Sequence, residues 1–189
     1  MAIIDLHHRA LTVAGAVVAR VRSTDLARPT PCAGWDLAAL LGHMVGQNHG
    51  FAEAVEAGSA PRSAYAPRPA GWPASADRLT SAFATAPPDR VVLLVEISEE
   101  LRFPVPVVAG FHLLDTVVHT WDVATALGEP FRPDDELVAA TLAQARLVPA
   151  GAARVRPGAA FAPVLPAAGD DWEQALALLG RDPHGRLAA

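Results

Sequence analysis

Residues 111–122 read Phe-His-Leu-Leu-Asp-Thr-Val-Val-His-Thr-Trp-Asp, and they decide how the rest of the chain is interpreted. Half of the stretch is apolar and it lacks proline and glycine, so it predicts a helix over about residues 107–127. Asp115 and His119 are four positions apart, a rotation of about 40° beyond one helical turn, so both side chains leave the same face. A carboxylate and an imidazole placed in this way can hold one metal ion.

A candidate for a third ligand lies on another predicted helix. That helix is expected to begin after Asp36, a good N-cap residue, and to end near Ala57; it carries His43. If His43 faces Asp115 and His119, the three form a facial metal site with open coordination positions. Two other interpretations stay open: His43 can be a hydrogen-bonded core histidine, and the other two can be a surface i,i+4 pair. The apolar neighbours argue against a surface pair, because an unpaired buried carboxylate is costly.

Two further polar residues are candidates for supporting roles. Asp122 lies close to one turn beyond His119, where it can orient an imidazole or, equally well, cap a loop backbone. Gln47 lies one turn after His43 and can hold a ligand or a bound water. Cys32 can supply a thiolate, but a lone cysteine in a proline-rich turn is more often a packing residue.

The remaining pattern predicts more helices, separated by proline- and glycine-rich connectors. Further helices are expected over residues 3–22, 76–86, 134–148 and 170–180, a small β-hairpin over 90–97 and 101–106, and loops over 24–35, 59–75 and 149–169. Helices of this number and length predict a mostly α-helical fold, an antiparallel four-helix bundle with an additional short C-terminal helix. A chain of 189 residues predicts one domain, spanning residues 1–189.

Composition excludes several classes of function. The net charge of −5 gives no electrostatic basis for binding nucleic acid or an anionic membrane. No apolar run approaches the roughly 20 residues that span a bilayer, and the first residues lack the pattern of a secretory signal. One cysteine excludes an internal disulfide and suits a reducing compartment, so a cytoplasmic location is predicted. The sequence has no nucleotide-binding glycine loop and no nucleophile elbow, which leaves metal chemistry as the indicated activity.

Several motifs together resemble a known family. They are Pro29-Thr-Pro-Cys-Ala-Gly-Trp-Asp36, Leu37-x-x-Leu-Leu-Gly-His43, Leu114-Asp-Thr-Val-Val-His-Thr-Trp-Asp122, and in the tail Phe161–Pro166 and Leu176–Pro183. The chain is similar to actinobacterial proteins of the DinB-like superfamily. Within it, the chain resembles the N-terminal domain of mycothiol-dependent maleylpyruvate isomerase. The likeness covers nearly the whole chain, and residues 59–106 are its least similar part.

The resemblance implies a four-helix bundle that holds a divalent metal through His43, Asp115 and His119. Zinc is the expected ion, with nickel, iron and manganese as alternatives. The resemblance also implies that a low-molecular-weight thiol such as mycothiol acts on a small electrophile, as in an S-transferase or isomerase. Isomerisation of maleylpyruvate itself is not expected, because those isomerases have a further C-terminal domain and this sequence ends at Ala189.

Two alternative functions remain open. One is a metal-assisted tailoring enzyme of secondary metabolism, which would act without a thiol. The other is a bundle without catalytic activity that binds a small molecule or uses its ion as a structural staple. A structural zinc normally has four protein ligands, and the sequence offers three good candidates, which favours catalysis. In each case the expected partner is a small molecule, and the protein is expected to be a monomer or a homodimer.

Overall fold

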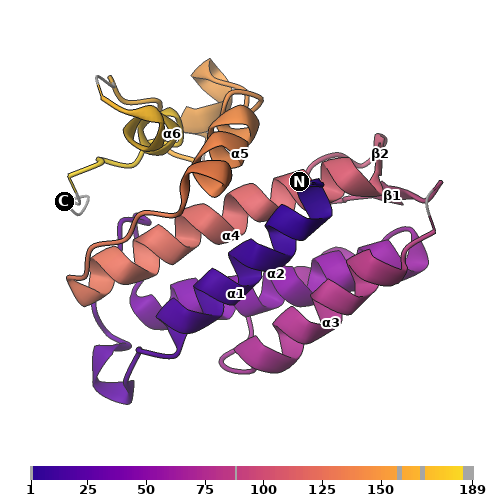
Figure 1. Ribbon diagram of the computed structural model, residues 1–189, viewed down its shortest axis with the longest axis horizontal. Coiled ribbons are helices and arrows are strands. Elements are labelled where there is room, and N and C mark those ends of the chain that lie inside the picture. The colour runs from indigo at the N-terminus through magenta and orange to yellow at the C-terminus, as the bar shows by residue number, and fades with distance from the viewer. Residues whose placement is uncertain (1, 88, 157–158, 167–168, 185–189) are drawn as a thin grey trace.

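The computed structural model describes residues 2–87, 89–156, 159–166 and 169–184. Its helices are α1 (Ile3–Val18), α2 (Leu37–Ala57), α3 (Trp72–Thr85), α4 (Val105–Leu127), α5 (Asp135–Ala145) and α6 (Asp171–Leu178), joined by short 3-10 turns at Ser23–Asp25, Arg62–Tyr65 and Gly151–Val155. Strands β1 (Val91–Leu93) and β2 (Arg102–Pro104) pair as an antiparallel hairpin. The prediction of a mostly α-helical fold with a small hairpin is confirmed (Figure 1). Among the described residues, no helix combines the length and apolarity that a bilayer span requires.

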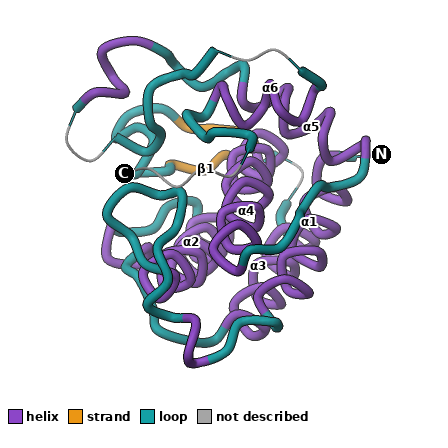
Figure 2. The backbone as a smooth tube through the Cα atoms, turned by 90° about the vertical axis from the view of Figure 1, so that its left-hand side faces the viewer, coloured by secondary structure: helices purple, strands orange, loops and turns teal. Residues whose placement is uncertain are grey.

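Helices α1 to α4 lie side by side as a bundle, and α5 and α6 pack on each other next to α4 and α1 (Figures 1 and 2). Side-chain contacts give the helix directions. His7, early in α1, contacts His112, early in α4, so these two helices run the same way. Phe51, late in α2, also packs on His112, so α2 runs in the opposite direction. The site described below lies between the antiparallel helices α2 and α4.

Helix α3 runs in the same direction as α2, because residues 58–71 first return along the α2 surface. The returning chain packs on a glycine face of α2, formed by Gly42, Gly46 and Gly50 at helical four-residue spacing. A Cβ atom at Gly46 would lie 2.6 Å from the Tyr65 carbonyl oxygen, and one at Gly50 would overlap the Tyr65 ring. Only glycine therefore lets the chain approach α2 this closely.

Aspartate side chains fix the start of three helices. Asp36, Asp134 and Asp170 each accept hydrogen bonds from backbone N–H groups in the first turn of α2, α5 and α6. Asp134 and Asp170, the first residues of the predicted segments 134–148 and 170–180, are the N-caps, so α5 and α6 themselves begin one residue later. Such caps satisfy donors that have no partner within the helix.

Some boundaries differ from the prediction. Helix α3 begins at Trp72 rather than residue 76, and α4 begins at Val105 rather than residue 107. In both cases a proline, Pro73 or Pro106, lies in the first turn, where its missing N–H costs nothing. Helices α1, α5 and α6 end two to four residues earlier than predicted, at Val18, Ala145 and Leu178.

Helix α4 is the central element of the fold. It contacts α1, α2 and α5, and most of its residues are buried. Because other helices surround α4, its polar side chains are buried together with its apolar ones, among them His119, Thr120 and Asp122. Because buried polar groups need partners, the polar side chains of α4 define the site.

Candidate metal centre

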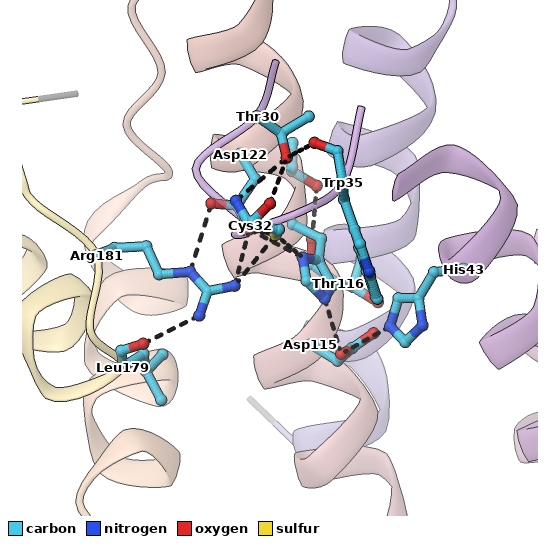
Figure 3. A network of polar contacts seen from close by, with 11 residues as sticks. Thr30, Cys32, Trp35, His43, Asp115, Thr116, Asp122, Leu179 and Arg181 are labelled. Carbon is cyan, nitrogen blue, oxygen red and sulfur yellow. Dashed lines mark hydrogen bonds and ion pairs between the residues drawn. The ribbon is translucent and has the colours of Figure 1, made fainter. Parts of the chain in front are cut away.

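The structure brings together the three residues that the sequence singled out. Helix α2 supplies His43, and α4 supplies Asp115 and His119. Asp115 Oδ1 lies 3.6 Å from His43 Nε2 and 3.3 Å from His119 Nε2 (Figure 3). The ligand atoms of the three residues all lie within 4.8 Å of one another. The side chains of His43 and Asp115 are 21% and 24% exposed, so solvent and small molecules can reach this side of the group.

Electrostatics ties Asp115 and His119 into a charged pair. Burial by itself raises the pKa of Asp115, but the charge and hydrogen bonds of His119 and His43 outweigh it and hold the pKa well below its ordinary value. Burial likewise lowers the pKa of His119, but Asp115, together with hydrogen bonds to Asp122 and Cys32, raises it well above its ordinary value. The positive charge beside Asp115 is therefore carried by the His119 ring, and a divalent ion bound here would have to replace the proton on that ring.

The other nitrogen of His119 faces a different acid. His119 Nδ1 lies 2.9 Å from Oδ2 of Asp122, one of the two supporting candidates, which is fully buried. The Arg181 guanidinium contacts both oxygens of Asp122, with Nη2 3.1 Å from Oδ2 and Nε 3.4 Å from Oδ1. Burial raises the pKa of Asp122, but Arg181 and His119 outweigh it and lower the pKa, so the carboxylate stays ionised.

Cys32 belongs to this network. The sequence had favoured a packing role for it. Its thiol donates to Asp122 Oδ2 at 3.2 Å, and Arg181 Nη2 lies 3.4 Å from its sulfur. The motif at residues 29–36 forms a tight turn that holds the thiol there: the Thr30 hydroxyl donates to the Trp35 carbonyl and accepts from the Cys32 N–H. The proline-rich motif thus serves to aim a side chain at α4 (Figure 3).

Cys32, His119 and Asp122 form a second group whose ligand atoms also lie within 4.8 Å of one another. The two groups share His119, which offers Nε2 to one and Nδ1 to the other. The second group already contains a cation, because the Arg181 guanidinium contacts both Cys32 and Asp122. Of the two, the group of His43, Asp115 and His119 is the one open to an added ion.

Two further side chains shape the surroundings. Trp35, 36% exposed, packs against His43 with the two ring planes tilted by 49° and their centroids 4.9 Å apart, and forms an apolar wall beside the group. Gln47, the second supporting candidate, donates from Nε2 to Glu96 Oε2 at 2.8 Å. That bond ties α2 to the turn of the β1–β2 hairpin and gives the Gln47 amide nitrogen a partner outside the group.

Sequence reasoning missed Arg181 entirely. The residue follows α6, 59 positions after Asp122, so no local spacing connects the two. The available signal was the tail motif Leu176–Pro183, which contains Arg181 and was recognised as part of the resemblance without being given a role.

A helical bundle with an imidazole–carboxylate–imidazole group between α2 and α4 defines a class of candidate metalloproteins. The family described as "Mycothiol maleylpyruvate isomerase N-terminal domain" matches residues 7–124, and the chain belongs to this family. The matched range contains His43, Asp115 and His119. Two uncharacterized proteins of Mycobacterium tuberculosis, Rv0738 of strain H37Rv and MT0763 of strain CDC 1551, are each 30% identical over 185 residues, covering 93% of this chain and 95% of theirs. No solved structure gives a significant match.

Proposed function

We propose that the protein is a divalent-metal-dependent enzyme that uses a low-molecular-weight thiol of the mycothiol type to act on a small electrophile. The metal ligands in this proposal are His43, Asp115 and His119. One observation carries it: the Nε2 atoms of two histidines from different helices converge on the same carboxylate oxygen, at 3.6 and 3.3 Å, on a solvent-accessible side of the bundle.

The donor set fits a divalent ion. Two imidazole nitrogens and one carboxylate oxygen are typical of zinc sites that keep a position free for a substrate or water. The same donors suit iron, nickel and manganese, so zinc is proposed as the first ion to test. The group of Cys32, His119 and Asp122 is not proposed as the metal site, because a cation bound there would have to displace Arg181.

A divalent cation, when bound, favours a thiolate over a thiol and polarises a substrate carbonyl. The chain's own residues prepare the site for it. Asp122 accepts a hydrogen bond from His119 Nδ1, so that a ring that gives up its other proton to an ion presents its Nε2 lone pair on the side of Asp115. Trp35 offers an exposed aromatic surface beside His43, which suits an apolar part of the electrophile.

Family membership supports the choice of thiol, because the description of the matched family names mycothiol and an isomerase. An S-transferase or an isomerase reaction is proposed, with the particular electrophile left to screening. The proposal places the protein in the cytoplasm, where low-molecular-weight thiols are kept reduced, and treats it as a monomer or a homodimer with a small-molecule substrate.

The first test is a titration of the full-length, untagged protein with zinc and cobalt. We expect one ion per chain, and at least a tenfold weaker affinity in each of His43→Gln, Asp115→Asn and His119→Gln. Cys32→Ser is the matched control for the second group, and we expect it to keep the affinity. Loss of binding in Cys32→Ser with full binding in His43→Gln would assign the ion to the other group.

The second test concerns the thiol. Addition of a mycothiol-type thiol to the cobalt protein is expected to change the cobalt absorption spectrum, and thiol consumption with an electrophile panel is expected to require the metal. Turnover without a thiol would instead support a metal-assisted tailoring enzyme. Metal binding with neither a thiol effect nor turnover would support a binding module.

A further inference from the structure

Arg181 is a buried cation that belongs to none of the helices around the candidate metal centre. Its exposed fraction is 6%, and it reaches the site from the segment after α6 (Figure 3). Each of its nitrogens has a partner: Nε and Nη2 contact the two oxygens of Asp122, Nη2 also contacts Cys32, and Nη1 donates to the Leu179 carbonyl at 3.0 Å. A buried arginine whose three guanidinium nitrogens all have partners is held in a single orientation.

The C-terminal segment is itself organised to present this side chain. Arg154, also 6% exposed, donates to four backbone carbonyls, those of Val148, Pro149, Ala162 and Leu178. The guanidinium groups of Arg154 and Arg181 lie 5.9 and 5.7 Å from the centroid of the Phe161 ring. These contacts hold the chain before α6 against the chain after it. The Arg181 side chain extends from this segment on the side that faces α4.

We propose that Arg181 is a positioning residue for the metal centre, acting on His119 through Asp122. This inference rests on the proposed function. The guanidinium holds the Asp122 carboxylate with both oxygens engaged, and Asp122 in turn accepts from His119 Nδ1. The chain of contacts fixes the orientation of the His119 ring and its tautomer, so that Nε2 is the free ligand atom. Partners of this kind set the basicity and orientation of metal-binding histidines.

The geometry requires arginine rather than any cation. Asp122 is fully buried, so it needs a positive partner, but a lysine ammonium is a single point and cannot contact both carboxylate oxygens, the Cys32 sulfur and the Leu179 carbonyl in this arrangement. A lysine would therefore keep the charge and lose the orientation. This difference separates a positioning role from simple charge compensation.

The test compares the full-length wild type with Arg181→Met, Arg181→Lys and the control Arg132→Met. Arg132 also pairs with a residue of the C-terminal segment, Asp170 at 2.7 Å, but lies 46% exposed and away from the site. Cobalt affinity is measured by competition with a chelator, the visible cobalt spectrum reports ligand geometry, and ¹⁵N NMR of histidine reports the tautomer in the zinc protein. Urea unfolding of each variant gives its stability separately.

We expect Arg181→Met to bind cobalt about tenfold or more weakly with an altered spectrum, Arg181→Lys to be intermediate, and Arg132→Met to match the wild type. Wild-type affinity, spectrum and His119 tautomer in Arg181→Met would overturn the inference and leave the proposed function standing. If Arg181→Met does not fold, the same comparison is made with Arg181→Lys, and wild-type behaviour there overturns the inference. Absence of metal binding in the wild type would overturn both.

Discussion

Lowering the pH from 7 to 5 is expected to destabilise the metal-free protein through two buried histidines. His7 and His112 are each 1% exposed, and His7 Nε2 lies 3.0 Å from His112 Nδ1. The Thr116 hydroxyl lies 3.0 Å from the same His112 nitrogen. Burial lowers the pKa of His7 well below its ordinary value and that of His112 to about 4, so both rings are neutral in the folded protein.

The sign of the effect follows from comparing the two states. In the unfolded chain a histidine has an ordinary pKa of about 6.5, so it takes up a proton as the pH falls toward 5, while the folded protein does not. Stability is therefore full above pH 6.5 and is lost as the pH falls toward the folded pKa. For His112, with a folded pKa of about 4, the loss between pH 7 and pH 5 amounts to about 2 kcal/mol. His7 adds to it in the same direction.

The assay is urea unfolding at pH 7 and pH 5, followed by far-UV circular dichroism with a chelator present, since metal binding is itself pH-dependent. His112→Gln is expected to lose about 2 kcal/mol less than the wild type over this interval. His8→Gln, which changes an exposed histidine on α1 next to His7, is the control and is expected to behave like the wild type. The raised pKa of His119 acts in the opposite direction in all three proteins and cancels in the comparison. An identical loss in wild type and His112→Gln would refute the assignment of the effect to this buried pair.

Two further predictions test the parts of the fold that hold the site. Gly46→Ala is expected to destabilise the protein by about 1–3 kcal/mol, because its Cβ would lie 2.6 Å from backbone carbonyl oxygens of the returning chain. Gly42→Ala, whose nearest contact would be at 3.4 Å, is expected to stabilise the protein by up to about 1 kcal/mol through the higher helix propensity of alanine. Urea midpoints compare the two, and equal stabilities would contradict the close approach of the chain to α2. Arg154→Met is expected to leave four carbonyls without their donor, and hydrogen exchange is expected to become faster across residues 149–180 while α2 keeps its protection. Unchanged exchange in that segment would show that Arg154 does not organise it.

The sequence predicted the central part of the candidate site because that part is local. Asp115 and His119 share a face through helix geometry alone, whatever the helix packs against. His43 required more, since the residue lies on another helix and its direction depends on packing. The sequence offered it as a candidate third ligand, and the resemblance to a family pointed to the same three residues. The helix starts at Asp36, Asp134 and Asp170 were likewise readable, because a capping side chain acts within its own first turn.

The features that the sequence did not reveal arise from contacts between distant segments. Cys32 appeared to be a packing residue, and its contact with Asp122 depends on how a turn before α2 meets α4. Gln47 appeared free to support the site, and its bond to Glu96 depends on where the hairpin lies. The start of α3 was misplaced because a proline in the first turn of a helix resembles a proline in a loop.

The sequence by itself determined the helical class of the protein and the face of α4 that carries a carboxylate and an imidazole, because helical periodicity and capping are properties of neighbouring residues. Only the tertiary structure decided which nitrogen of His119 meets which acid, and which cation balances Asp122. Those outcomes depend on Arg181, which reaches α4 from the end of the chain. Burial makes the pairing necessary, and burial belongs to the packed fold rather than to any stretch of sequence.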